Sequence, residues 1–335
     1  MSTFKEIRGT LIKSVSSDPA NPQIGQIWYN STIGSLKGYQ SIGGAWAAGG
    51  NMSTAMLRAA AAGTQTAGLV FGGIQSTGDG SVTNEYDGTN WTVGGALTTA
   101  RQLLAGAGSQ TAGLGFGGYG PPSMNAKTET YNGSSWTEVG DLNTARGALS
   151  GCGTQTAALA AGGYYILPPG NTSGYYANVE EWNGSSWTEV NNLPQVVSAG
   201  VGTGTQTAAL NVGGRNNPPG GTTIANAYEY DGTNWTTGGS LGTATNSAGI
   251  GGSQTAAVFF GGQTPSAPSG TSTSQLYDGS SWTTTGSLAT ARRELSGQGT
   301  QTAALASGGN IPPPTNTSEE FTDPSFATQT LTTST

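Results

Sequence analysis

Short runs of apolar and small residues alternate along this chain with clusters of Gly, Ser, Thr, Asn and Asp. The alternation is repetitive, because the stretch GTQTAALAAGG at residues 153–163 occurs six times with small changes. A Trp stands 26 residues before the first Gly of the pair that closes each copy. Constant spacing over all copies indicates a structural repeat. The six residues are Trp46, Trp91, Trp136, Trp187, Trp235 and Trp282.

The second repeat predicts four short strands and has no helical periodicity. A tight turn is expected at Asp87–Asn90, because Asp and Gly tolerate the positive φ of such turns. Four strands per repeat are typical of one blade of a β-propeller, so the predicted fold class is all-β. The expected strands are residues 84–86, 91–93, 102–108 and 112–116.

The two ends of the repeat complement each other. Residues 318–321 match residues 179–182, the third strand of another unit, but no Trp follows them. Trp46, in contrast, begins a fourth strand with no third strand before it. We therefore expect the last blade to be closed by an N-terminal and a C-terminal strand, which removes the open edge of the sheet. Residues 325–335 remain as a C-terminal tail.

The order and spacing of the Gly pair, the Tyr and the Trp resemble the kelch repeat over residues 41–324. The resemblance implies a six-bladed kelch-like β-propeller. The chain departs from the pattern in two ways: its inner strands are poor in bulky residues, as at residues 151–153, and an Arg after the fourth strand occurs in only three of six units. The first departure has a physical reason: six inner strands converge on one axis, where only small side chains leave enough room.

All variation in repeat length falls between the Gly pair and the next conserved aromatic position of the repeat, and insertions in an array often mark a binding face. Tyr and Asn on Pro-braced loops suit sugar rings or protein surfaces, although simple loop filling is the alternative. The loops are residues 74–83, 119–128, 164–179, 215–227, 263–274 and 310–318. The candidate binding residues are Tyr119, Tyr164, Tyr165, Tyr175, Tyr176, Arg215, Asn216 and Asn217.

Residues 1–40 precede the repeat and predict an extended arm followed by a β-hairpin across the turn 31–34. A disordered leader is the alternative. The pattern Asn21-Pro22, then Gly25 to Asn30, then Gly34, Leu36 and Lys37, resembles a segment of structural proteins from marine tailed phages, including tail-fibre and appendage proteins. The resemblance implies a virion protein with an N-terminal attachment region. Candidate attachment residues are Trp28, Tyr29 and Leu36.

Composition narrows the possible partners. Only 9% of residues are charged, yet 8 Trp and 12 Tyr provide apolar area to bury, which argues against disorder. The net charge of −7 and the lack of a basic cluster argue against a nucleic-acid partner. With no His and with Cys152 as the single cysteine, no disulfide, metal site or cofactor is expected. We expect Cys152 to be a small buried filler.

No segment has the length of a secretion signal or a membrane span, so membrane insertion is not expected.

An enzyme is not expected either. Arg101, Arg146 and Arg292 occupy equivalent positions, which distributes them around a ring, and we interpret them as structural residues that bond to neighbouring loops. Copper oxidases with kelch-like propellers need His ligands, and this chain contains no His. Paired carboxylates for glycoside hydrolysis would have to come from a few acids, most of them at repeat positions. Turn chemistry explains the hairpin acids Asp87, Asp231 and Asp278, with Asn132 and Asn183 in the same position.

We therefore expect a phage virion structural protein, a tail-fibre or appendage module whose propeller contacts a host-surface glycan or protein. Its location would be the virion, outside cells, and residues 1–40 would contact other virion proteins. Two alternatives stay open: a capsid-decorating protein, and a carbohydrate- or protein-binding propeller of cellular origin. The oligomeric state is also open.

Overall fold

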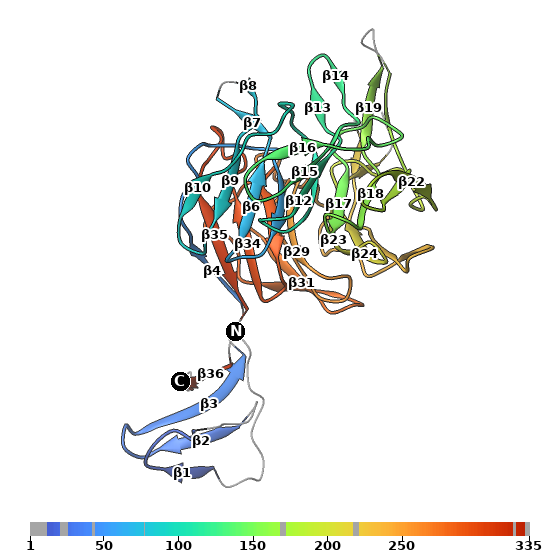
Figure 1. The fold of residues 1–335 in the computed structure, drawn as a ribbon. Helices are drawn as coiled ribbons and strands as arrows, with labels where there is room; N and C mark the ends of the chain where they lie inside the picture. Colours follow the sequence, from blue (N-terminus) through green and yellow to red (C-terminus); the bar gives the residue numbers. More distant parts are fainter. Residues whose placement is uncertain are drawn as a thin grey trace. The chain divides into compact units, whose positions relative to one another are not determined.

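The computed structural model describes residues 12–20, 26–41, 44–76, 78–167, 172–216, 221–323 and 326–331. The chain divides into two compact units: unit 1 comprises Met1–Gly44 with Asp323–Thr335, and unit 2 comprises Ala45–Thr322. Every regular element in the described ranges is a β-strand (Figure 1). Consequently, no described segment forms a helix that could span a membrane.

Unit 1 contains one four-stranded sheet in the order β1-β2-β3-β36. Strands β2 and β3 pair antiparallel across the turn 31–34, where the sequence predicts a hairpin, while β1 is parallel to β2. The expected C-terminal tail is not only a tail: β36 pairs with β3, so the two ends of the chain share this sheet. The strands are β1 (Lys13–Val15), β2 (Ile27–Asn30), β3 (Ser35–Ser41) and β36 (Phe326–Thr330).

Unit 2 contains six four-stranded antiparallel sheets in its described ranges, which we number 1 to 6 along the chain. Sheet 1 is β5 (Ala60–Gly63), β6 (Gly68–Phe71), β9 (Thr83–Tyr86) and β10 (Trp91–Val93); sheet 2 is β11 (Ala105–Gly108), β12 (Gly113–Phe116), β15 (Thr128–Tyr131) and β16 (Trp136–Glu138); sheet 3 is β17 (Ser150–Gly153), β18 (Ala158–Ala161), β21 (Val179–Trp182) and β22 (Trp187–Val190). Sheet 4 is β23 (Val201–Thr205), β24 (Ala208–Val212), β27 (Ala227–Tyr230) and β28 (Trp235–Thr237); sheet 5 is β29 (Gly249–Gly252), β30 (Ala257–Phe260), β31 (Ser274–Tyr277) and β32 (Trp282–Thr285); sheet 6 is β33 (Ser296–Gly299), β34 (Ala303–Ser307), β35 (Ser318–Thr322) and β4 (Ala45–Ala48).

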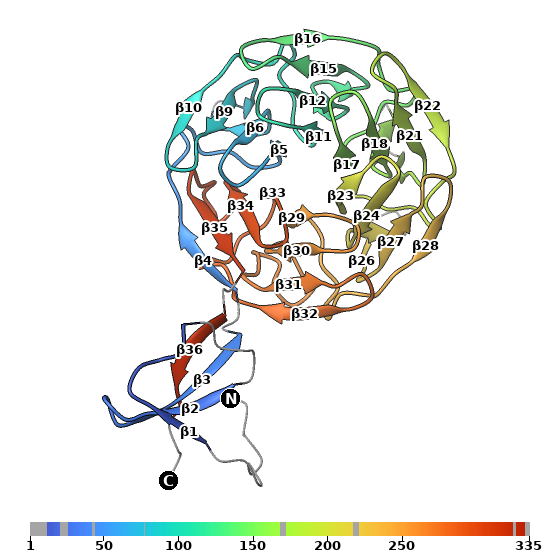
Figure 2. The ribbon, with the colours of Figure 1, turned by 60° about the horizontal axis from the view of Figure 1, so that its bottom comes forward.

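The first strand of each sheet faces a common centre, and the fourth strand lies at the rim (Figure 2). Each inner strand lies beside the inner strand of the next sheet, and β33 lies beside β5. In sheet 6, β35 and β4 pair antiparallel, with Phe321 opposite Trp46. The pairing that the sequence predicts between the two ends of the repeat is therefore present, and the arrangement is that of a β-propeller-type fold.

The Gln of each GTQT-type turn joins neighbouring sheets, which explains why this residue recurs. Gln155, for example, donates from Nε2 to the carbonyl oxygens of Gly113 (3.0 Å) and Tyr131 (2.6 Å) in the preceding sheet. Gln65 makes the equivalent bonds to Ala304 and Phe321, which join sheet 1 to sheet 6. The other members are Gln110, Gln206, Gln254 and Gln301.

Aromatic side chains fill the outer part of the wedge between sheets. Each aromatic of the third strand lies against the Trp of the fourth; the ring centroids of Tyr131 and Trp136 are 4.9 Å apart. Trp136 also reaches Phe71 of the preceding sheet at 4.6 Å. Nearer the axis the residues are small, and Cys152 is buried there as expected. Burial raises the pKa of the Cys152 thiol to about 12, so it stays protonated at neutral pH.

Four Tyr hydroxyls donate to a Glu on the third strand of the preceding sheet. Where the aromatic has no hydroxyl, the Glu is missing: Trp182 faces a sheet with Thr130 at that position, and Phe321 faces one with Leu276. The Tyr position and the Glu position therefore vary together from repeat to repeat, because the carboxylate needs the Tyr hydroxyl as its hydrogen-bond donor. The pairs are Tyr86–Glu320, Tyr131–Glu85, Tyr230–Glu181 and Tyr277–Glu229.

These pairs predict a loss of stability at alkaline pH. Burial, and then the hydrogen bond to Glu, raises the pKa of Tyr86, Tyr131 and Tyr277 to about 12 from 10.0. A Tyr whose pKa is higher in the folded state stabilises fully below about pH 10 and loses this contribution as the pH rises through about 12. We expect the urea concentration at the unfolding midpoint to fall as the pH rises from about 10 to about 12. It should fall less in Tyr131→Phe, because that variant lacks one of the titrating hydroxyls. A midpoint that stays level from pH 8 to 12 would contradict this assignment.

Candidate functional site: a cavity at the loop-bearing end of unit 2

Six equivalent residues, each twelve positions after the repeat Trp, form a ring around the centre of unit 2. Each N–H donates to the carbonyl oxygen of the equivalent residue in the preceding repeat at 2.7–2.9 Å, and the circle closes from Arg58 to Glu294. All six have φ between 49° and 57° although none is Gly. This left-handed conformation costs about 1 kcal/mol or more per residue, which the closed hydrogen-bond circle offsets. The ring residues are Arg58, Leu103, Ala148, Ala199, Ser247 and Glu294.

The ring corrects one sequence prediction. We expected a strand over 102–108, but β11 begins only at Ala105. Leu103 takes part in the ring, and its positive φ is incompatible with an extended strand. The inner strand therefore starts after the ring residue in each sheet.

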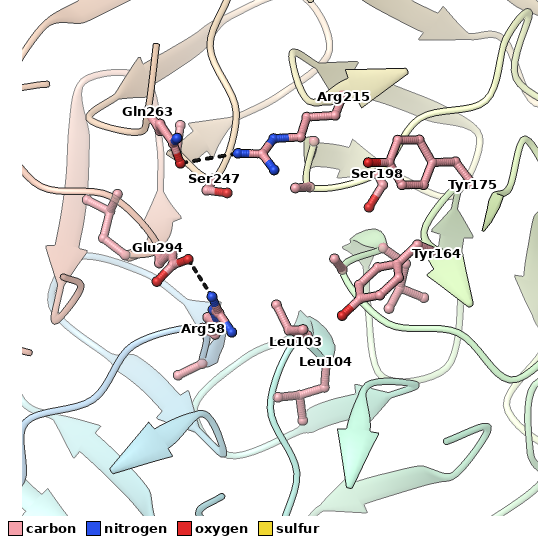
Figure 3. A pocket seen from close by; sticks show the side chains of 17 residues that line it. Arg58, Leu103, Leu104, Tyr164, Tyr175, Ser198, Arg215, Ser247, Gln263 and Glu294 are labelled. Atoms are coloured by element: carbon pink, nitrogen blue, oxygen red, sulfur yellow. Dashed lines mark hydrogen bonds and ion pairs between the residues drawn. The ribbon is translucent and has the colours of Figure 1, made fainter. Parts of the chain in front are cut away.

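A cavity of about 450 Å³ lies at this ring and falls within the size range of small-ligand sites (Figure 3). All six ring side chains line it, although they differ in chemistry from one repeat to the next. The variable loops add Tyr164, Tyr175, Arg215 and Gln263. Leu104, Leu149 and Leu295 supply an apolar part of the wall. The cavity is thus bordered by the three longest of the six variable loops, residues 164–179, 215–227 and 263–274.

Four of the six variable loops contain a short hairpin, which positions side chains such as those of Tyr164 and Arg215. The hairpins are β7 (Ile74–Gln75) with β8 (Gly78–Asp79), β13 (Tyr119–Gly120) with β14 (Ser123–Met124), β19 (Tyr164–Leu167) with β20 (Thr172–Tyr175), and β25 (Arg215–Asn216) with β26 (Thr222–Thr223). Tyr164 and Tyr175 are direct cross-strand partners in the third hairpin. A Cβ added to Gly221 would stand 2.5 Å from the Tyr175 hydroxyl and 3.1 Å from Cβ of Arg215. Tyr175 and Arg215 therefore both lie against Gly221, where a side chain would not fit.

One side of the cavity is charge-balanced. Arg58 and Glu294, neighbours in the ring, form an ion pair at 2.8 Å. Arg58 also donates from Nη1 to Oε1 of Gln102 (3.2 Å), and Gln102 donates from Nε2 to Oδ1 of Asp79 (2.8 Å). The guanidinium of Arg58 thus has an acid in direct contact and a second acid one residue away.

The other side carries excess positive charge. Arg215 donates from Nη2 to Oε1 of Gln263 (3.3 Å), and Arg293 donates from Nη1 to the same oxygen (3.0 Å) and to the carbonyl of Pro268 (2.9 Å). Within the described ranges, no acidic side chain forms an ion pair with Arg215 or Arg293. Figure 3 shows Arg215 across the cavity from Arg58.

Tyr164 also borders the cavity. Burial raises its pKa, and the charge of Arg58 opposes this effect to a smaller extent. Its hydroxyl is therefore protonated at neutral pH and can donate a hydrogen bond.

None of the other candidate binding residues that the structure describes lines the cavity. Tyr165 and Tyr176 pack against each other, with centroids 4.8 Å apart, and do not line it. Tyr119 pairs through its backbone with Gln102. Asn216 donates from Nδ2 to Oε1 of Gln195 (3.0 Å). Asn217 lies outside the described residues.

In unit 1 the three candidate attachment residues differ in exposure. Trp28 is buried, and its indole N–H donates to Oδ1 of Asp18 at 2.9 Å. Hydrogen bonds from Asn30 and then Trp28 lower the pKa of Asp18. Tyr29 is 41% exposed, and Leu36, its partner across the hairpin, is half-buried. Trp28 therefore supports the sheet, while Tyr29 offers a surface for contact.

The three repeat Arg residues are buried in ion pairs with Glu residues of third strands, whereas the sequence analysis expects them to bond to neighbouring loops. Arg101 pairs with Glu129 and Arg146 with Glu180, each at 2.6 Å with both side chains fully buried, and Arg292 pairs with Glu319. Each pair joins one sheet to the next. The sequence explains why only three repeats carry the Arg: the remaining repeats lack the Glu as well. Their pairs are Met56 with Asn84, Val197 with Tyr228, and Thr245 with Gln275.

The hairpin acids also have the expected turn role. Oδ1 of Asp87 accepts the backbone N–H groups of Thr89 (2.8 Å) and Asn90 (2.7 Å), and these bonds lower its pKa. Asp278 accepts the equivalent bonds, and its pKa falls to about 2. The described residues contain no cluster of three or more acidic or Cys side chains that could hold a metal ion.

The sequence analysis did not identify Arg58, Gln263, Glu294 or the other ring residues as candidates. A usable signal exists: the position twelve residues after each Trp is constant in spacing but carries Arg, Leu, Ala, Ala, Ser and Glu in turn. Fixed geometry with variable chemistry distinguishes this position from the recurring Gln, Trp and Gly pair.

No family model and no curated protein matches the chain. Its fold is similar to that of solved structures, among them one described as "Structure of YjhT". The TM-score is 0.67 at 14% sequence identity, and the match covers 83% of this chain and 99% of that chain. At this identity the likeness concerns the fold alone, which is of the propeller-like all-β type.

Proposed function

We propose that this chain is a virion display protein. Unit 2, as a six-bladed kelch-like β-propeller, binds a glycan or protein of the host surface at the cavity, and unit 1 joins it to other virion proteins. The closed ring of six backbone hydrogen bonds, the closure of sheet 6 and the Gln bridges between successive sheets support the blade number. The Gly-pair, Tyr and Trp spacing supports the kelch-like class. The phage-like pattern of residues 21–37 supports the virion.

The observation that carries the proposal is the position of the cavity relative to the chain connections of unit 2. The chain enters this unit at Ala45 and leaves at Thr322, and these residues are directly opposite each other in sheet 6. The preceding carbonyl, of Phe321, accepts a hydrogen bond from Gln65 in a GTQT-type turn. These turns follow the inner strands, whereas the ring residues precede the inner strands and the variable loops follow the antiparallel second strands, at the other end of each sheet. The connections therefore leave unit 2 at the end of the sheets opposite the cavity.

The proposal predicts that cavity aromatics are needed for host binding. Replacing Tyr164 and Tyr175 together by Ala should weaken adsorption of the purified protein to host cells by about tenfold or more, because aromatic anchors contribute a large share of binding energy. The melting temperature should change little, since both residues lie in a surface hairpin. Adsorption measured by flow cytometry on candidate marine bacterial hosts checks this.

Tyr165→Ala is the matched control, because Tyr165 belongs to the same hairpin but does not line the cavity. Adsorption that is equal in wild type and the double variant would mean that the cavity is not the host site. If the protein then bound purified phage particles and no cells, a decorating role would replace the proposed one.

A further inference from the structure

We infer that the cavity binds a saccharide carrying an oxyanion, a carboxylate or a sulfate, through the guanidinium of Arg215. The inference rests on the proposed function, since it names the ligand class of the same cavity. It is carried by the distribution of positive charge in unit 2, by the environment of Arg215 and by the shape of the cavity.

The cations of unit 2 fall into two groups. Three Arg residues are engaged in buried ion pairs, and Lys127, just before β15, pairs with Glu138 of the outer strand β16 at 2.7 Å. The remaining three, Arg58, Arg215 and Arg293, all lie at or beside the cavity. In a chain of net charge −7, every cation of this unit that is not in those four pairs is therefore at one place.

Within this group, Arg215 is the one that lacks compensation in the cavity wall. Glu294 is the single acid among the lining residues, and Arg58 already pairs with it. Arg215 donates to the neutral amide of Gln263 and to no acid among the described residues. Arg215 is half-buried, so its guanidinium is partly withdrawn from water while no described acid compensates its charge. The amide of Gln263 orients the Arg215 guanidinium but carries no charge, so the positive charge of Arg215 is left for a ligand. Arg293 donates to the same amide oxygen and adds a second positive charge nearby.

Guanidinium groups recognise planar or tetrahedral oxyanions through two parallel hydrogen bonds. The rest of the wall suits a hydroxyl-rich ring rather than a chain. Tyr164 and Tyr175 supply aromatic area, Ser198 and Ser247 supply hydroxyls, and leucines supply an apolar wall. A peptide, in contrast, is usually bound along an exposed sheet edge or a long groove. The lining residues are distributed around the ring and do not follow one strand, so the cavity offers a ring-sized space and no long groove.

The test uses the purified full-length protein on a printed array of neutral, uronate-bearing and sulfated oligosaccharides, with acidic peptides as further spots. We expect binding to anionic saccharides and not to their neutral counterparts. Arg215→Gln should weaken it about ten- to a hundredfold, the usual effect of losing hydrogen bonds to a charged group. Arg215→Lys should retain part of the affinity, because it keeps the charge but loses the fork. The uronate and sulfate arms identify which oxyanion is preferred.

Lys127→Gln is the matched control, because it removes one positive charge from a surface pair outside the cavity and should leave binding unchanged. Circular dichroism melting confirms that each variant is folded. Equal binding of neutral and anionic saccharides, or equal losses in Arg215→Lys and Arg215→Gln, would overturn the oxyanion requirement while leaving host binding by the cavity intact. Binding to acidic peptides alone would overturn the saccharide class. Full binding in Arg215→Gln with loss in the Tyr164 and Tyr175 double variant would also refute the role of Arg215 but keep the proposed function.

Discussion

Glu180→Gln is expected to lower the free energy of unfolding by about 3–5 kcal/mol, the usual cost of leaving one member of a buried ion pair without its partner. Arg146 and Glu180 are both fully buried, and their 2.6 Å contact joins sheet 2 to sheet 3. Glu180 also accepts the backbone N–H of Asn143 at 2.7 Å. The amide can keep this second bond, so the loss would come from the uncompensated charge of Arg146.

The double variant Arg146→Met and Glu180→Gln should recover more than half of that loss. Each half of this replacement occurs in the chain, although in different repeats: Met stands at the Arg position in residue 56, and Gln stands at the Glu position in residue 275. Gln275 keeps the backbone bond, since its Oε1 accepts the N–H of Gly242 at 3.0 Å. Urea denaturation of the wild type, both single variants and the double variant gives the coupling energy. Additive losses would show that the ion pair does not connect the two sheets energetically.

The second large effect concerns closure of the circle of sheets. A chain of residues 45–322 should melt as unit 2 does in the full-length protein, whereas a chain of residues 50–322, which lacks β4, should lose several kcal/mol or fail to remain monomeric. Trp46 contacts Phe321 and Phe260, with centroids 5.1 and 4.7 Å apart, and its indole donates to Ser274. Loss of a Trp from such a site costs about 3–5 kcal/mol.

Deletion of β4 also exposes the edge of β35, and exposed edges promote association with other chains. Differential scanning calorimetry and size-exclusion chromatography of the two chains measure both effects. Equal melting temperatures would show that closure by the N-terminal strand is not needed for stability. Aggregation of the longer chain as well would show that unit 2 depends on unit 1.

The sequence predicts most of the repeat, because its rules are local. Turn residues such as Asp87 and Gly88, the alternation in the strands and the Trp spacing all specify short-range geometry. The pairing of β35 with β4 could also be predicted, because each end lacked what the other supplied. The buried ion pairs could be interpreted as structural from their equivalent positions, although their Glu partners were not identified.

The cavity could not be predicted in the same way. The ring residues are consecutive in space but separated by a whole repeat in sequence, and their left-handed conformation is a consequence of closure. Arg58 and Glu294 are 236 positions apart, yet they form an ion pair. Tyr164, Tyr175 and Arg215 were found because long loops stand out in sequence, whereas Gln263 was missed because its loop contains no aromatic cluster. The role of β36 in unit 1 was missed for a similar reason, since its partner strand lies near the other end of the chain.

The central claim, that unit 2 binds the host through its loop-end cavity, is tested most directly by filling the cavity. Leu is already accommodated in the ring at residue 103, so Ala148→Leu with Ala199→Leu should be tolerated by the backbone while occupying ligand space. Saturation binding of the chain of residues 45–322 to host cells should then fall by about tenfold or more at an unchanged melting temperature. Undiminished binding by the folded variant would place the host contact elsewhere and contradict the account.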